Sequence, residues 1–368
     1  MQRIDYISWL PHGTTGTPFR MMTPWRTLMI YGAPFLLVCS IWVGFTRRRS
    51  VTALLTILAV NGALLALLGF LQRMLGADKI FWVWQPPAPY FVASFIYKNH
   101  AGAYFTLMVA VCATLATWHF ARTERRFLKS TPGGVFAFLC ATAAITVIIS
   151  YSRAAVIVLL AFVVGVALAI MVRRILRPAV DRHLAVTGML ACVLIAFVGI
   201  GLYWLKAGVA WDRMNDLLER DRASSITARE TATRATFEMA RDELWLGHGS
   251  GSFRFIFPKY QQHYPVLGVE GGIIRTLWEN AHNDYAEALA EWGLIGVLPL
   301  FAIITFWLAR AIRLEFWRHP ALLVLLAGLA MPMLHSWVDF NAHNPAILTT
   351  WCALWPCLVR WLEIEERA

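Results

Sequence analysis

The sequence predicts an all-α polytopic membrane protein with about nine transmembrane helices and one large, mostly helical extracytoplasmic loop. Hydrophobic residues make up 58% of the 368 positions and charged residues only 15%, a balance that no water-soluble core of this size needs. The apolar residues fall in runs of about 20, the length with which an α-helix crosses a hydrocarbon core about 30 Å thick. A polar stretch, residues 206–292, interrupts this pattern and is the expected place for chemistry.

Nine apolar runs are the expected spans. They cover residues 28–46, 51–71, 101–121, 133–151, 154–172, 184–205, 293–313, 321–339 and 343–361. The chain then divides into an extracytoplasmic N-terminal segment (1–27), six helices (28–205), the polar loop (206–292) and three helices with a short cytoplasmic tail (293–368).

Clusters of arginine and lysine set the expected orientation. They lie in four short loops, at 47–49, 122–129, 173–182 and 310–318. All four loops fall on one side when nine spans are threaded, and the positive-inside rule makes that side the cytoplasm. The N-terminal segment, the loop 72–100 and the polar loop should therefore face outward.

Composition excludes several other classes of protein. The net charge of +11 comes from short basic clusters between apolar runs, so a nucleic-acid partner is not expected. All six cysteines lie inside apolar runs, which argues against disulfides and thiolate zinc sites outside the membrane. The sequence has no HExxH, Walker A or Asp-x-Asp motif, so no metal or nucleotide cofactor is expected.

The stretch 224–241 of the polar loop is predicted to be a helix because Ser or Thr can cap it and no Pro or Gly interrupts it. Arg234 has Glu230 and Glu238 four residues before and after, which favours surface ion pairs. Arg229 has Ser225 and Thr233 at those positions, so no carboxylate of its own helix neutralises it. It is either a structural cation or a binding group for an anion.

Two further segments of the polar loop contain candidate groups. The glycine-rich segment 247–253 is either a flexible turn or a set of backbone amides for phosphate. In the segment 279–293, Asn280 could cap a helix whose first turn carries His282. The positive end of that helix disfavours imidazolium, which suits a neutral general base, although a packed polar histidine is the alternative.

Charged and polar residues also mark the ends of predicted spans on the outer side. Arg153 is the only charge between Gly134 and Val172, so it either reaches a functional site or extends to the membrane surface. The third span opens with a polar run, Lys98, Asn99 and His100. In the turn before the last span, Asp339 could orient a histidine or an arginine, or cap a helix.

Taken together, these motifs resemble the O-antigen ligase and polymerase superfamily of bacterial inner membranes. The resemblance extends from about Leu54 to Trp361. Its motifs are Ser-x-Ser-Arg at 150–153, the arginine-bearing helix, the glycine-rich segment 245–253, Ala-His-Asn-Asp-Tyr at 281–285 and Ala-Glu-Trp-Gly-Leu-Ile-Gly at 290–296, with Lys-Asn-His-Ala at 98–101.

The resemblance implies transfer of a glycan from an undecaprenyl diphosphate carrier to a glycan, lipid or protein acceptor at the periplasmic face, with no metal or cofactor. His282 matches the family's essential loop histidine, and Arg153 and Arg229 match its diphosphate-binding arginines. We expect supporting roles for other residues near these motifs: Lys98, Asn99, His100, Asn283, Asp284 and Asp339. Single displacement with inversion at the sugar C1 is the mechanism that these roles predict.

The sequence leaves several alternatives open. A ligase of lipopolysaccharide synthesis and a polymerase of O-antigen or exopolysaccharide share the same motifs. A transporter of lipid-linked glycans would use the same arginines without catalysis, and an inactive scaffold could pair with a complete paralogue. Because the family usually has about twelve spans, we also expect that upstream helices are missing or that a partner subunit supplies them.

Overall fold

The computed structural model describes residues 24–86, 90–126, 131–176, 199 and 222–367. Within these residues the chain is mostly helical, as the apolar pattern predicts, and its one sheet has two strands. The chain forms two compact units. Unit 1 comprises Met1–Leu37, Val209–Leu308 and Ser336–Pro345, and unit 2 comprises Val38–Gly208, Ala309–His335 and Ala346–Ala368.

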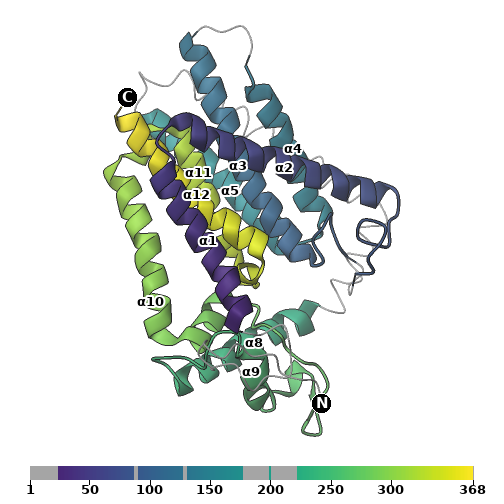
Figure 1. Cartoon of the computed structure of the whole chain (residues 1–368). Helices are drawn as coiled ribbons and strands as arrows, with labels where there is room; N and C mark the ends of the chain where they lie inside the picture. Colours follow the sequence, from purple (N-terminus) through teal and green to yellow (C-terminus); the bar gives the residue numbers. More distant parts are fainter. Residues whose placement is uncertain (1–23, 87–89, 127–130, 177–198, 200–221, 368) are drawn as a thin grey trace. The chain divides into compact units, whose positions relative to one another are not determined.

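Unit 2 is a bundle of apolar helices. It contains α2 (Arg48–Met74), α3 (Lys98–Arg126), α4 (Gly133–Ile149), α5 (Arg153–Leu176), α11 (Pro320–His335) and most of α12 (Pro345–Glu366) (Figure 1). Helix α3 is the central one, packing against α2, α4, α5 and α11. Small residues allow this packing, since Gly102 lies against Ser152 and Ala155 at the start of α5, and Gly328 lies against Ala110.

A group of ion pairs joins helix ends in unit 2. Glu363 of α12 is buried and pairs with Arg310 at 2.7 Å and Arg360 at 2.6 Å. Nearby, Arg48 at the start of α2 pairs with Glu365 at 2.5 Å. A buried carboxylate is stable only with such partners, so these arginines serve structure.

Four described helices are long and apolar enough to cross a membrane: α2, α3, α5 and α10 (Asp284–Arg313). Three shorter apolar helices coincide with three more predicted spans. They lie in α1 (Pro24–Gly44), α4 and α11. The predicted span 184–205 falls almost wholly outside the described residues. The chain is thus a helical membrane protein, and the count of nine spans stays a prediction.

Unit 1 contains the polar loop. Helix α8 (Arg222–Asp242) confirms the helix predicted at 224–241. It packs against α9 (Phe253–Gln261) and the short helix η2 (Pro265–Leu267), and a hairpin of β1 (Val269–Glu270) and β2 (Ile273–Ile274) follows. The core of this unit joins residues of α8, α9 and the start of α10, among them Ala232, Met239, Phe253, Phe257, Ala281 and Ala290.

Candidate functional site

The first half of α10 carries three buried carboxylates on one face. Asp284, Glu287 and Glu291 are spaced three and four residues apart, which places them on the same side of a helix. They are 8%, 2% and 4% exposed. Buried acids need hydrogen-bond donors, and backbone amides of the segments 247–253, 279–283 and 336–344 donate to these three.

Glu291 holds the glycine-rich loop. Its two carboxylate oxygens accept hydrogen bonds from the amides of Gly251 at 2.8 Å and Phe253 at 2.9 Å. The amides of His248 and Gly249 donate to backbone carbonyls of α10. Because these four amides are bonded within the protein, they are not available for phosphate, which was one of the two alternatives for this segment.

The same loop packs tightly against α10. Gly247 and Gly293 both have positive φ, 67° and 59°. A Cβ on Gly247 would lie 2.4 Å from the carbonyl oxygen of Glu291, and one on Gly293 would lie equally close to that of Trp245. Glycine is therefore required at both positions. At Gly293 the helix breaks, and the freed amides of Leu294 and Ile295 donate to the carbonyls of Leu244 and Trp245.

Glu287 and Asp284 hold the two segments around His282. Glu287 accepts a hydrogen bond from the amide of Ala281 at 2.7 Å, and its other oxygen lies 3.1 Å from Nε2 of His343. Asp284 accepts from the amide of Ala342 at 3.0 Å, and its own amide donates to the carbonyl of Ser336. The segments 279–283 and 336–344 are thus fixed to the same helix.

His343 lies among these acids, in the turn before α12. Burial lowers its pKa, but the carboxylates of Glu287, Asp284 and Glu291 raise the pKa by more, from the ordinary 6.5 to about 10. His343 is therefore a cation at neutral pH that balances the buried acids.

The helix cap is not the predicted one. Oδ1 of Asn283 accepts hydrogen bonds from the amides of Tyr285 and Ala286, both at 3.1 Å, so Asn283 caps α10. The prediction that Asn280 caps the helix and that His282 lies in its first turn is wrong. His282 directly precedes the cap with φ of 55°, a left-handed conformation that costs a non-glycine residue about 1–3 kcal/mol and is concentrated at functional sites.

Asp339 lies beside His282, as one of its predicted roles requires. Oδ1 of Asp339 is 3.4 Å from Nδ1 of His282, and the Asp339 side chain is fully buried. At this distance Nδ1 makes no hydrogen bond of good geometry within the described residues. The rings of Trp278 and Phe340 flank the imidazole edge-on at 5.6 and 4.9 Å. The imidazole remains 21% exposed, so it is held on one side and accessible on another.

The two arginines of α8 differ as the sequence predicts. Arg234 is exposed and lies 3.9 Å from Glu238. Among the described residues, Arg229 has no ion-pair or hydrogen-bond partner for its guanidinium. It is half-buried, one and two turns before the buried Ala232 and Thr236 on the same face. This placement leaves Arg229 available to an anion.

The remaining candidate residues belong to unit 2. Arg153 begins α5 and is exposed. Lys98, Asn99 and His100 begin α3, where Asn99 is buried and donates to the hydroxyl of Tyr97 at 2.8 Å. Because Gly102 lies against Ser152 and Ala155, the two helix starts are neighbours. Unit 1 thus brings His282, Asn283, Asp284 and Asp339 together and contains Arg229, while Arg153 shares unit 2 with the start of α3.

Sequence reasoning missed the roles of Glu287, Glu291 and His343. A signal was present, because three acids at helical spacing next to an apolar run are costly unless they are bonded. Their partners are loop amides that no sequence pattern identifies.

Comparison with known proteins gives one family match, and it covers part of the candidate site. A family model described as O-antigen ligase matches residues 135–301. The match contains Arg153, Arg229 and His282, whereas Lys98, Asn99, His100 and Asp339 lie outside it. No curated protein matches the chain.

Proposed function

Because the chain belongs to the O-antigen ligase and polymerase superfamily, we propose that it transfers a glycan from an undecaprenyl diphosphate carrier to an acceptor hydroxyl. The reaction takes place at the periplasmic face of the bacterial inner membrane. The single observation that supports it most is the pair of His282 and Asp339. The backbone of His282 is strained, and its partly exposed imidazole lies beside the buried carboxylate of Asp339.

His282 is the general base in this proposal. Asp339 faces Nδ1, so it would hold the proton on that nitrogen and leave Nε2 to accept a proton from the acceptor hydroxyl. The acceptor oxygen attacks the sugar C1 as its proton passes to Nε2. The bond between C1 and the diphosphate oxygen breaks, and its electron pair leaves with undecaprenyl diphosphate. One displacement of this kind inverts the configuration at C1.

Arg229 and Arg153 bind the diphosphate. Negative charge grows on the leaving oxygen as the C1 bond breaks, and preorganised guanidinium groups stabilise it through charge-assisted hydrogen bonds. The absence of a partner for Arg229 among the described residues supports its assignment. For Arg153 the support is its match to the family's motif and its position at the exposed start of α5.

Substitution of Arg229 tests this assignment. Arg229→Ala should lose about 2.7–4 kcal/mol of transition-state stabilisation, the loss typical of a removed oxyanion donor. Arg234→Ala is the matched control, since it removes the same charge from an exposed position of the same helix. If both variants keep wild-type kcat/KM, Arg229 does not bind the transition state.

Product formation tests the function itself. The purified protein in detergent should move radiolabelled glycan from undecaprenyl diphosphate to an acceptor. Lipid A core as the acceptor identifies a ligase, and a second lipid-linked glycan identifies a polymerase. A transporter or an inactive scaffold forms no product with either acceptor, and that result would refute the proposal.

A further inference from the structure

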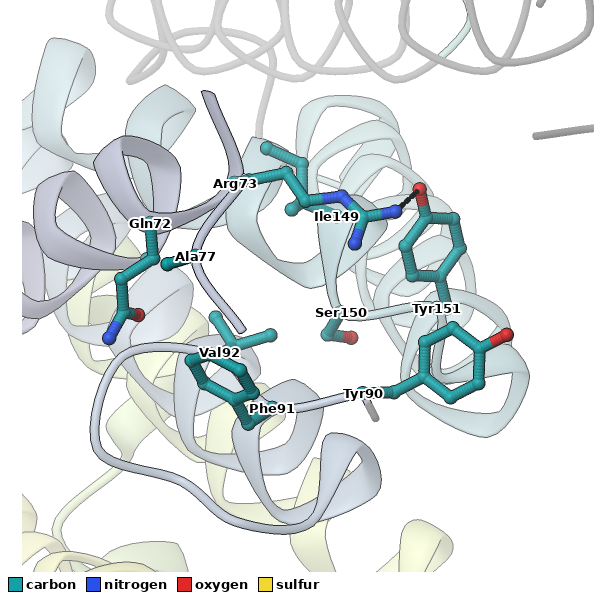
Figure 2. Close-up of a pocket in the computed structure, with 10 residues that line it drawn as sticks. Gln72, Arg73, Ala77, Tyr90, Phe91, Val92, Ile149, Ser150 and Tyr151 are labelled. Atoms are coloured by element: carbon teal, nitrogen blue, oxygen red, sulfur yellow. Dashed lines mark hydrogen bonds between the residues drawn. The ribbon is translucent and has the colours of Figure 1, made fainter. Parts of the chain in front are cut away.

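Unit 2 contains an open pocket between the end of α2, residues 77 and 90–92 of the segment after it, and the turn between α4 and α5 (Figure 2). It is open to solvent, and the space of about 400 Å³ that no atom fills includes part of that solvent. Polar and aromatic side chains line it, among them Gln72, Arg73, Tyr90, Ser150 and Tyr151. The catalytic proposal assigns no role to these residues.

Arg73 supplies a positive charge at this pocket. Its Nη2 donates a hydrogen bond to the hydroxyl of Tyr151 at 2.6 Å, and its guanidinium carbon lies 4.8 Å from the centre of the same ring. Figure 2 shows the guanidinium extending from α2 toward Tyr151. No carboxylate of the described residues forms an ion pair with Arg73. In the described part of the chain, four of its five N–H donors have no partner, so they are placed to bind an anion.

Two tyrosine rings form an aromatic wall. Tyr90 and Tyr151 lie 6.2 Å apart at 63° to each other, and Nζ of Lys98 lies 5.4 Å from the centre of the Tyr90 ring. Tyr90 is 39% exposed, so part of its ring is open to a ligand. Tyr151 has φ of 56°, which shows that the turn before α5 holds this residue in a strained conformation.

Gln72 is a buried residue of the lining. Its side chain is 3% exposed, and Nε2 donates to the carbonyl of Ala93 at 3.2 Å. Oε1 has no hydrogen-bond partner within the described structure. The hydrogen bond from Nε2 fixes the segment around Ala93 to the end of α2, which lines the pocket.

We propose that this pocket binds a sugar residue that carries a carboxylate or phosphate group. The guanidinium of Arg73 pairs with the anion, and an aromatic ring packs on the apolar face of the sugar. The role of the pocket in holding a substrate glycan rests on the proposed function, whereas its affinity for the sugar does not.

Titration of the full-length protein in detergent with four probes tests the inference. The probes are D-glucuronate, D-glucose 6-phosphate, D-glucose and inorganic phosphate, with binding followed by ligand-observed NMR. The two acidic sugars should bind about tenfold more tightly than glucose, the effect of one charge-assisted contact. Equal affinity for acidic sugars and glucose in the wild type would overturn the proposal without any variant.

Three variants assign the binding to the pocket. Arg73→Gln should remove the preference for acidic sugars, and Arg49→Gln, the same change at an exposed position at the other end of α2, should keep it. Tyr90→Ala should weaken all three sugars and leave phosphate unchanged. If glucuronate binds the Arg73→Gln protein as tightly as the wild type, or if Tyr90→Ala weakens no sugar, the pocket does not bind acidic sugars. If the protein binds acidic sugars but transfers no glycan, only the catalytic proposal is refuted. If it transfers glycan but does not bind acidic sugars, only the proposal for this pocket is refuted.

Discussion

Asp339→Asn removes the carboxylate charge that lies 3.4 Å from Nδ1 of His282 while keeping the size of the side chain. When His282 takes the acceptor's proton it becomes a cation, and at an effective dielectric of about 20 a charge pair at 3.4 Å attracts by about 5 kcal/mol, an upper limit. A hydrogen bond to a charged group contributes about 1.5–3 kcal/mol. Since about 1.36 kcal/mol is a tenfold change in rate, kcat should fall by about 10- to 150-fold.

The assay is glycan transfer by the purified variant at saturating donor, with the melting temperature measured on the same sample. KM for the donor should stay close to the wild-type value, because Asp339 acts through His282 and not on the diphosphate. Asp242→Asn is the control: Asp242 is another acid of unit 1, and it accepts a hydrogen bond from Tyr260. If Asp339→Asn keeps its kcat within twofold of wild type, or if the two variants lose activity only in step with lost stability, Asp339 does not orient the base.

Three further predictions concern the segments that hold the site. Gly247→Ala should destabilise the protein by about 1–3 kcal/mol through overpacking, visible as a lower melting temperature, whereas Gly165→Ala, which meets nothing within 4 Å, should not. Glu291→Gln should cost about 1–3 kcal/mol because a loop amide loses its acceptor oxygen, and hydrogen exchange should speed up in the glycine-rich loop; unchanged protection would contradict this. The folded-state pKa of His343 is raised from 6.5 to about 10, so its stabilisation is complete below pH 6.5 and is lost as the pH rises toward 10. The melting temperature of the wild type should therefore fall more steeply between pH 7 and 10 than that of His343→Gln, and parallel curves would refute the assignment.

The helices were predictable because their signals are local. Apolar runs give the position of α2, α3 and α5, and the absence of Pro and Gly gives α8. The contrast between Arg229 and Arg234 also follows from residues four positions away on the same helix. Each of these predictions needs only the nearest turns of one helix.

The start of α10 was harder because two asparagines compete for the cap. Asn280 and Asn283 both precede the helical pattern, and the composition favours neither. The tertiary structure decides which asparagine caps the helix. Glu287 accepts a hydrogen bond from the amide of Ala281, and Asn283 accepts hydrogen bonds from the amides of Tyr285 and Ala286. His282 is therefore placed before the helix in a left-handed conformation that no periodicity predicts.

The pairing of His282 with Asp339 joins positions 57 residues apart. The sequence allowed Asp339 to orient a histidine, to orient an arginine or to cap a helix. The bonds that fix the segment 336–344 to Asp284 and Glu287 bring the carboxylate of Asp339 to the imidazole. Long-range contacts of this kind depend on the packing of several segments, so residue spacing does not encode them.

The rate of a single turnover of glycan transfer by purified His282→Ala protein tests the central claim most directly. His263→Ala is the matched control, because His263 is an exposed histidine of the same unit. The account predicts a loss of about 10²- to 10⁴-fold for His282→Ala, the contribution typical of a general base, and a wild-type rate for His263→Ala. Transfer by the His282→Ala protein at the wild-type rate would contradict it.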